Sequence, residues 1–560
     1  MPVLTGQERP LGELLTPRQK FLLLNSLMLT MFISALDGSI VATATPHILA
    51  DLGGFNLLSW VFTIYLLAST VVVPLVGKLS DMYGRKPFIL AGIAVFVAAS
   101  AACGAAPSML ALIVARAVQG IGGGILFGCI FATLGDLFTP LERAKYMGYF
   151  IGAFTLASLA GPTVGGFLTD GPGWRWCFYI NLPVGIVATA FVWRNLPYSR
   201  RGGSLRRIDF AGAALLSSST ICILLGLVWA NEEFGWGSAE TIGLFIAGAV
   251  LLVAFLFQER RHPEAIFPLG LFGNRVFVQA NLLAVLQSAG MFGAIQYLPT
   301  FIQTSLGHSA TSSGLVSTPQ SLGTLVSSFI AGQLISRTGR FKYPVVFGTC
   351  LILVATLLLQ TLDVGMDAWH ISLFMAMYGL GSGIVMPTVS VIVQSAVPFE
   401  FLGVATSGRQ FFMQIGQVLG AAIFGVVVAT SYSNAFSDNL THGAELPAHA
   451  YQQFEDPTLG LDARALGQVR TEILALPNGQ AIFDDAVASQ KEGVATAIRH
   501  IFLGSSVVAL VTVLLAATMK EIPLRRTFGN ATAVPQAAAG RSPEPARPLL
   551  EEAPQVIHDL

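Results

Sequence analysis

Charged residues are scarce in this chain: Asp, Glu, Lys and Arg make up 11% of its 560 residues. A soluble globular chain carries roughly 25%, so these charges are too few to cover a soluble surface of this size. Basic and acidic residues are equal in number, 31 each, and the lack of a basic excess argues against a nucleic-acid partner. Apolar sequence dominates instead: 53% of residues are hydrophobic and the mean hydropathy is +0.67.

Motifs for catalysis and metal binding are also missing from the sequence. There is no Gly-Lys-Ser/Thr phosphate loop, no histidine pair at zinc spacing and no Gly-x-Ser-x-Gly stretch. The five cysteines have neither pairing nor metal-ligand spacing, and we interpret them as small core residues. We therefore predict that the protein is not an enzyme or an ATP-driven pump, and that it has no cofactor and no metal site.

Apolar runs of about twenty residues recur along the chain, and each is long enough to cross a bilayer as a helix. We predict fourteen spans, which makes this an all-α integral membrane protein. The predicted ranges are 21–48, 57–77, 87–106, 109–138, 145–169, 177–195, 210–229, 240–257, 275–300, 313–336, 343–362, 369–397, 405–431 and 500–519.

An even number of spans places both termini on one side of the membrane. Basic residues gather in alternate short loops, and Arg175 is the exception. By the positive-inside rule, those loops and both termini are cytoplasmic in a multi-pass protein of the plasma or bacterial inner membrane. The basic loops contain Lys78, Arg85 and Lys86; Arg143 and Lys145; Arg200, Arg201, Arg206 and Arg207; Arg260, Arg261 and Arg275; and Arg337, Arg340 and Lys342.

Two halves of the sequence resemble each other. "GKLSDMYGRK" begins at Gly77 and "GQLISRTGRFK" begins at Gly332, an offset of 255 residues. At the same offset "GPTVGG" matches "GQVLGAA", and with a slip of four residues "QGIGGGI" matches "YGLGSGI". Three matches in the same order predict a duplicated bundle, with the two spans at 210–257 inserted between the halves. Such repeats are a common transporter plan.

This repeat divides the chain into segments. The predicted segments are a cytoplasmic tail at 1–20, a six-helix bundle at 21–195, two linker helices at 196–262, a second six-helix bundle at 263–520 with a long outer loop at 432–499, and a disordered cytoplasmic tail at 521–560.

Five stretches in order resemble the major facilitator superfamily, and within it the fourteen-span drug:proton antiporters. They are "LDGSIVATATP", "GKLSDMYGRK", "RAVQGIGGG", "GPTVGG" and "WRWCFYINLPVG". The resemblance covers roughly residues 20–520. It implies two pseudo-symmetric six-helix bundles plus two extra helices between them. It also implies alternating access around a central cavity, with small-molecule export coupled to proton entry; we expect a functional monomer in the lipid bilayer.

Two charges lie at membrane depth in the first half. Asp37 is in the first span and Arg116 in the fourth, and charged side chains there must face protein or water. The implied fold makes these spans neighbours, so we predict that the two residues pair. Burial disfavours a charged carboxylate and a nearby guanidinium favours it, a balance that suits reversible proton binding. A purely structural salt bridge and a permanently neutral carboxylate are the alternatives.

The loop after the second span is the candidate cytoplasmic gate. The resemblance implies that it clamps the two bundles together, whereas a loop that only fixes topology is the simpler interpretation. Arg409, in the span at 405–431, is a candidate partner across the bundle interface. The candidate gate residues are Gly77, Asp81, Gly84, Arg85, Asp136 and Arg409.

The fifth span carries a smooth face of small residues with one proline: Gly161, Pro162, Gly165 and Gly166. The resemblance implies an exporter hinge that packs against the span at 405–431, with Gly416 and Gly420 as its counterpart. Ordinary helix packing is the alternative.

The second half has no acid that matches Asp37, and Met375 stands where the repeat would place Arg116. Its spans carry amides and aromatic residues instead, which suit large amphipathic substrates, neutral or monocationic. The candidate cavity residues are Tyr65, Gln119, Phe127, Gln287, Phe292, Gln296, Tyr297, Gln320, Tyr378 and Phe412.

The sequence therefore predicts a proton-coupled exporter of hydrophobic or amphipathic molecules such as drugs and toxic compounds. Two alternatives stay open: a dedicated exporter of one endogenous metabolite, lipid or siderophore, and a non-transporting sensor built on a transporter fold.

Overall fold

The computed structural model describes residues 11–53, 57–198, 209–232, 234–308, 310–461, 463–522 and 524, and these residues contain helices and no strand. The predicted tails at 1–20 and 521–560 therefore lie largely outside the described residues. The long helices are α2 (Pro17–Leu52), α3 (Leu58–Tyr83), α4 (Arg85–Gly104), α5 (Met109–Leu137), α6 (Pro140–Asp170), α8 (Asn181–Asn195), α9 (Phe210–Glu232), α10 (Ala239–Arg261), α11 (Arg275–Thr300), α12 (Ala310–Thr338), α13 (Lys342–Leu359), α14 (Ala368–Ser395), α15 (Leu402–Asn439) and α18 (Gly479–Thr518).

Short elements connect these helices. They are the α-helices α1 (Leu11–Leu14), α7 (Trp176–Tyr179), α16 (Ala448–Phe454) and α17 (Ala463–Leu474), a π-helical turn at Phe301–Ser305, and 3₁₀ turns at Leu269–Gly273, Phe399–Phe401, Gly443–Glu445 and Leu459–Leu461.

Twelve helical segments in the described part of the chain are long and apolar enough to cross a membrane. The helices α11 and α12, with 26 and 29 residues, are as long but fall outside that set. Hydroxyl side chains are frequent in α12 and lower its hydropathy, whereas α11 contains residues 292–296, whose side chains lie outside the described part of the structure. Hydropathy and length therefore support a multi-pass membrane protein.

The same pattern of helix pairs occurs in both halves of the molecule. In the first half α2 packs on α6 and α8, while α5 packs on α3 and α4. In the second half α11 packs on α15 and α18, while α14 packs on α12 and α13. Corresponding helices thus have corresponding neighbours.

The two glycine-rich motifs form the closest of these contacts. In α5, Gly120 and Gly124 face α3 while Gly122 faces α4; in α14, Gly379 and Gly383 face α12 while Gly381 faces α13. At each position a side chain would collide with atoms of the neighbouring helix. Glycine is required because small residues let helices approach this closely.

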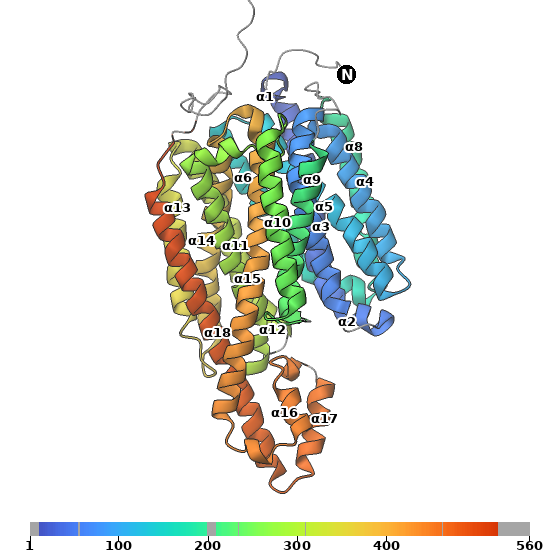
Figure 1. Ribbon diagram of the computed structural model, residues 1–560, viewed down its shortest axis with the longest axis vertical. Coiled ribbons are helices and arrows are strands. Elements are labelled where there is room, and N and C mark those ends of the chain that lie inside the picture. The colour runs from blue at the N-terminus through green and yellow to red at the C-terminus, as the bar shows by residue number, and fades with distance from the viewer. Residues whose placement is uncertain are drawn as a thin grey trace, which may run out of the picture.

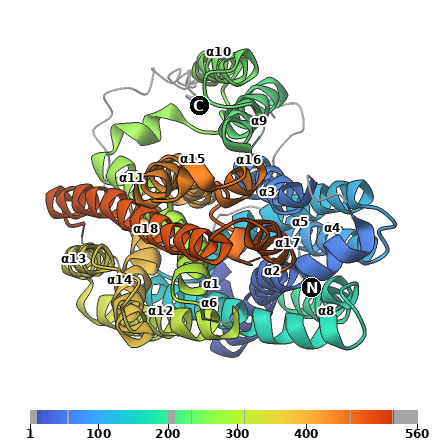
Figure 2. The same ribbon diagram turned by 90° about the horizontal axis from the view of Figure 1, so that it is seen from below.

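The helices α9 and α10 stand outside these two sets of pairs. They pack on each other, and the Ser219 hydroxyl donates a hydrogen bond of 2.8 Å to the Gly248 carbonyl. Of the two, α9 also contacts α3 and α15. Figure 2 shows the pair at the edge of the molecule.

The two ends of the molecule differ. The helix α2 begins and α18 ends at one end, which we call the near end; α16 and α17 project from the opposite, far end (Figure 1). The predicted outer loop 432–499 is mostly helical: α15 continues to Asn439 and α18 already begins at Gly479. Apolar residues of this projection, such as Phe436, Phe454 and Ile473, belong to a buried cluster that continues into α11, α13 and α14, and we call it the far-end apolar cluster.

Arg175, the exception in the predicted charge pattern, lies at the far end. Its guanidinium donates a hydrogen bond of 2.5 Å to the Asp51 carboxylate and lies 4.4 Å from the Trp174 ring centroid. Hydrogen bonds from Arg175 and then from Trp174 hold the pKa of Asp51 below its usual range. The positive charge of Arg175 is therefore locally compensated.

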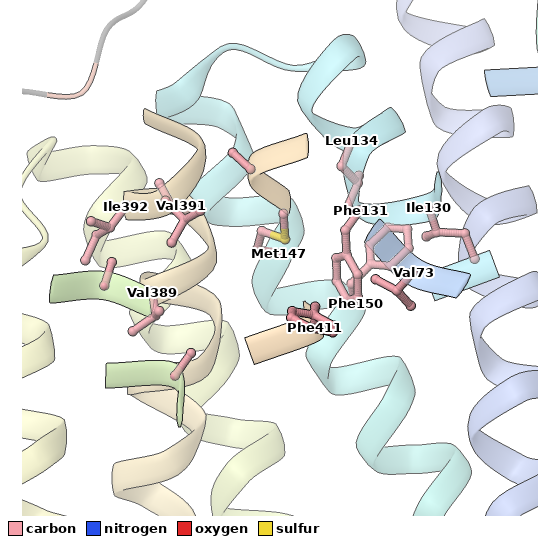
Figure 3. Close-up of a cluster of buried hydrophobic side chains, with 14 of the residues drawn as sticks. Val73, Ile130, Phe131, Leu134, Met147, Phe150, Val389, Val391, Ile392 and Phe411 are labelled. Carbon is pink, nitrogen blue, oxygen red and sulfur yellow. The ribbon is translucent and has the colours of Figure 1, made fainter. Parts of the chain in front are cut away.

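Apolar side chains fill the interface between the halves towards the near end (Figure 3). Phe131 of α5 lies 6.2 Å from Phe150 of α6, measured between ring centroids, and both belong to a buried cluster with Val73, Met147 and Phe411. We call these five residues the apolar seal. Because they come from α3, α5, α6 and α15, the seal joins the two halves.

Candidate functional site

Asp37 and Arg116 form an ion pair inside the first half, as the sequence predicts. A terminal nitrogen of Arg116, on α5, lies 2.6 Å from a carboxylate oxygen of Asp37, on α2. The side chains are 0% and 1% exposed, so water does not screen this pair. The ring of Tyr65 covers the guanidinium, with 4.4 Å between the guanidinium carbon and the ring centroid.

Two amides complete the shell around Asp37. The side-chain nitrogens of Gln119 and Asn181 each donate a hydrogen bond of 2.8 Å to Oδ1, while Arg116 occupies Oδ2. Arg116 also donates to the Val61 carbonyl at 3.1 Å and to the Gln119 side-chain oxygen at 2.7 Å. All three donors to Asp37 favour the charged carboxylate.

Asn181 and Ser100 are site residues that the sequence analysis does not single out. The Ser100 hydroxyl accepts a hydrogen bond of 2.8 Å from Gln119 and donates one of 2.7 Å to the Phe96 carbonyl. Asn181 begins α8, and its own oxygen is buried without a hydrogen-bond partner. The available signal is the single amide among apolar residues in "CFYINLPVG".

The negative charge of Asp37 is part of the contact between these helices. A proton on Asp37 would cancel its negative charge and leave Arg116 buried without a counter-ion, which is strongly unfavourable. The neutral acid would also need a hydrogen-bond acceptor where three donors now point. The Asp37 network therefore joins the four helices α2, α4, α5 and α8.

A second cluster lies at the near end. Arg85, at the start of α4, pairs with Asp81 and with Asp136, whose oxygen is 2.9 Å from Nε, and it donates to the Ser80 hydroxyl at 2.5 Å. Gly84 between α3 and α4 has φ 92°, a backbone conformation that favours glycine. The predicted charge cluster of Asp81, Arg85 and Asp136 is thus formed.

This cluster reaches across to the second half. The Val404 amide, in the first turn of α15, donates a hydrogen bond of 3.1 Å to the Asp81 carboxylate. The carboxylate also faces the positive end of the α15 dipole. Gly77 faces Ser407 and Gly403 so closely that a side chain would collide with them. The two halves are therefore held together at the near end.

Arg409 contacts the first half through the aromatic ring of Phe131. Its guanidinium carbon lies 5.8 Å from the centroid of the Phe131 ring, and its hydrogen bonds go to Gln410 and Met413. The sequence predicts Arg409 as a partner across the bundle interface, but the ion pairs of the described residues do not join it to Asp81 or Asp136.

The predicted partner of the "GPTVGG" face is wrong. Gly161 and Gly165 pack against α2, at Ser39 and Ile40, instead of against α15. Their counterparts in the repeat, Gly416 and Gly420, pack against α11 at Val285, Ser288 and Ala289. Each half uses its glycine face internally, because α2 and α6 correspond to α11 and α15. Pro162 is exposed, and Gly166 has no neighbouring atom within 4 Å of a Cβ position.

The candidate cavity residues do not converge on one cavity. Gln287 and Tyr378 lie together on a narrow cavity between α11, α13, α14 and α18, which has a volume of about 10 Å³. Tyr65 and Gln119 belong to the Asp37 network instead. The others are placed as follows: Phe127 packs on Phe154, Phe412 on Phe267 and Phe272, Tyr297 on the far-end apolar cluster, and Gln320 is buried on α12.

Phe292 and Gln296 lie in α11, but their side chains are outside the described part of the structure. The assignment of these ten residues to a substrate cavity stays a prediction.

Known proteins resemble this chain in sequence and in fold. The multidrug transporter protein MdtP of Bacillus subtilis is 41% identical over 433 residues, which cover 77% of this chain and 80% of that protein. Multidrug resistance protein 3 of the same bacterium is 35% identical over 81% of this chain and 88% of that protein.

The solved structure of the proton:xylose symporter XylE matches with a TM-score of 0.58 at 13% identity, over 90% of this chain and 96% of that chain. The family model described as Major Facilitator Superfamily matches residues 27–421. Together with the paired six-helix packing, these matches identify the chain as a member of the major facilitator superfamily of membrane transporters.

Proposed function

We propose that the protein is a proton-coupled antiporter that exports hydrophobic or amphipathic small molecules by alternating access. The observation that carries the proposal is the buried Asp37 network. Three donors hold one carboxylate, so binding of a proton to that carboxylate would release these donors and change the contacts between their helices. The names of the two Bacillus relatives support multidrug compounds as the substrate class.

The proposed topology has fourteen spans, with α11 and α12 as two of them and α9 and α10 as an insertion between the halves. Basic side chains at the near end, such as Lys86, Arg337 and Arg340, favour a cytoplasmic near end and cytoplasmic termini. In this orientation, the apolar seal and the Asp81–Val404 contact close the cytoplasmic side. The α16–α17 projection would then be extracytoplasmic.

The proposed cycle begins with this closed cytoplasmic side. Proton entry from the outside neutralises Asp37, and the released donors of Arg116, Gln119 and Asn181 let α2 and α8 shift relative to α5. That shift would break the contacts of Asp81 and the apolar seal and open the cytoplasmic side to substrate. Release of the proton to the cytoplasm restores the Asp37 network and returns the substrate-loaded protein to the outward-facing state.

The test is Asp37→Asn, which keeps the shape of the side chain but removes its charge. We expect the variant to reach the membrane and to lose efflux driven by a proton gradient. Glu264→Gln, which removes a carboxylate from a partly exposed ion pair with Lys78 at the near end, is the matched control and should keep efflux. Undiminished gradient-driven efflux in Asp37→Asn would remove this residue from the mechanism.

A panel of resistance assays, compared with an assay of metabolite release, separates a multidrug exporter from a dedicated one. Protection against chemically unrelated compounds supports the proposal. Protection against none of them, together with release of one metabolite, would favour the dedicated exporter.

A further inference from the structure

Arg409 differs from the other buried arginines that the structure describes. Arg85 and Arg116 pair with aspartates, and Arg143 donates to the carbonyls of Gly135 and Phe138 at 2.6 and 3.0 Å. Arg409 is 4% exposed and belongs to no ion pair of the described residues. Its positive charge is therefore buried without a counter-ion.

The contacts of Arg409 leave part of its guanidinium unsatisfied. One terminal nitrogen is 3.4 Å from the Gln410 oxygen, the other is 3.8 Å from the Met413 sulfur, and Nε has no hydrogen-bond partner. The sulfur is a weak acceptor. A cation buried at membrane depth is costly and is most often kept for function. In this conformation the guanidinium of Arg409 has fewer hydrogen-bond acceptors than it has donors.

The surroundings of Arg409 are apolar on one side and polar on the other. Phe131, a member of the apolar seal, lies beside the guanidinium. Gln414, one helical turn beyond Gln410, donates a hydrogen bond of 3.2 Å to Ser69 of α3 and keeps its own oxygen without a partner. These residues sit where α15 meets α3 and α5. If the halves separate at the near end, they become accessible together.

We propose that Arg409 binds the anionic group of a substrate when the near end opens, and that the substrates include amphipathic organic acids. A guanidinium matches a carboxylate with two parallel hydrogen bonds. The seal aromatics would pack against the apolar body of the same molecule. This inference rests on the proposed transport function and extends the neutral and monocationic substrates that the sequence favours to anions.

Three dansyl compounds test this proposal in proteoliposomes: dansylglycine carries a carboxylate, dansylamide is neutral, and dansylcadaverine carries an ammonium group. In Arg409→Gln we expect dansylglycine transport to fall by about tenfold, the loss for one charge-assisted interaction, while the other two rates stay within about twofold. Arg409→Lys should restore part of the dansylglycine rate, since it keeps the charge. Arg275→Gln, an exposed near-end arginine, should leave all three rates unchanged.

Direct binding of dansylglycine to the purified protein, measured by its fluorescence, should weaken in Arg409→Gln by a similar factor. Equal losses for all three compounds would overturn the proposal and assign Arg409 to the closing contact between the halves. Unchanged dansylglycine transport in Arg409→Gln would also overturn it. A wild type that moves the neutral and cationic compounds but not dansylglycine contradicts this inference alone; a wild type that moves none of them contradicts the proposed function as well.

Discussion

Both carboxylate oxygens of Asp37 accept hydrogen bonds from side chains of neighbouring helices, so the charged carboxylate holds these helices together. Arg116 holds Oδ2, while Gln119 and Asn181 hold Oδ1. Hydrogen bonds to a charged group contribute roughly 1.5–3 kcal/mol each, so the shell helps to hold together the helices that surround Asp37.

Asn181→Leu tests the shell directly, because leucine has a similar size and donates no hydrogen bond. Loss of one donor weakens the shell that holds the charged carboxylate, so the pH profile of transport should shift to higher pH. The readout is the pH profile of transport in proteoliposomes. Asn281→Leu, a buried asparagine on α11 that donates to the Phe277 carbonyl, should keep the wild-type profile. An unshifted profile in Asn181→Leu would separate Asn181 from proton binding.

Asp37 and Arg116 are recognised in the sequence because charges inside apolar spans are rare, and their pairing is predicted because the fold that the resemblance implies makes the two spans neighbours. It does not predict Asn181 or Ser100, since small polar residues recur in many spans and most of them bond to their own helix. Ser26 and Thr30, for example, donate to carbonyls four residues earlier in α2. Only the folded arrangement tells which polar residue turns towards a neighbouring helix.

The contact between α2 and α6 holds the helix that carries Asp37. Gly161→Leu should force these helices apart, because its side chain would meet Ser39. We expect a loss of about 1–3 kcal/mol, typical of overpacking, seen as a lower melting temperature and slower transport. Gly166→Leu is the matched control on the same helix, since no atom lies within 4 Å of its Cβ position. Equal melting temperatures for the two variants would contradict this packing.

Asp81 joins the α3–α4 turn to the start of α15. Asp81→Asn removes the charge that pairs with Arg85, and breaking a buried ion pair costs roughly 3–5 kcal/mol. The near end should open more often, so a cysteine introduced by Ser407→Cys, at a fully buried position, should react faster with a membrane-impermeant maleimide added on that side.

The control for Asp81→Asn is again Glu264→Gln. It breaks a partly exposed pair, with side chains 14% and 33% accessible, and such pairs contribute roughly 0–1 kcal/mol. Its maleimide reaction should match that of the protein with Ser407→Cys alone. No acceleration in Asp81→Asn would mean that this contact does not keep the near end closed.

Sequence patterns predict the existence of the helices better than their ends and partners. The span expected at 500–519 is the last part of α18, which begins at Gly479, because hydropathy falls where a helix leaves the membrane although the helix continues. The glycine face of α6 was predictable, but its neighbour was not. A smooth face indicates close packing and does not say which helix fills it.

The two halves share their packing but differ in chemistry. The buried ion pair of Asp37 and Arg116 is in the first half, and in the second half Met375 occupies the position that corresponds to Arg116. Arg409, which is buried and belongs to none of the ion pairs of the described residues, is in the second half. The sequence repeat predicts this asymmetry, whereas the contacts that close the near end, such as the apolar seal, depend on how the halves meet and need the structure.

Proton movement upon substrate binding tests the central claim most directly. The purified protein, in weakly buffered detergent solution with a pH dye, is mixed with a substrate that it transports. The account predicts release of about one proton per bound substrate from the wild type and none from Asp37→Asn. The same release from Asp37→Asn, or no release from a wild type that binds the substrate, would contradict it.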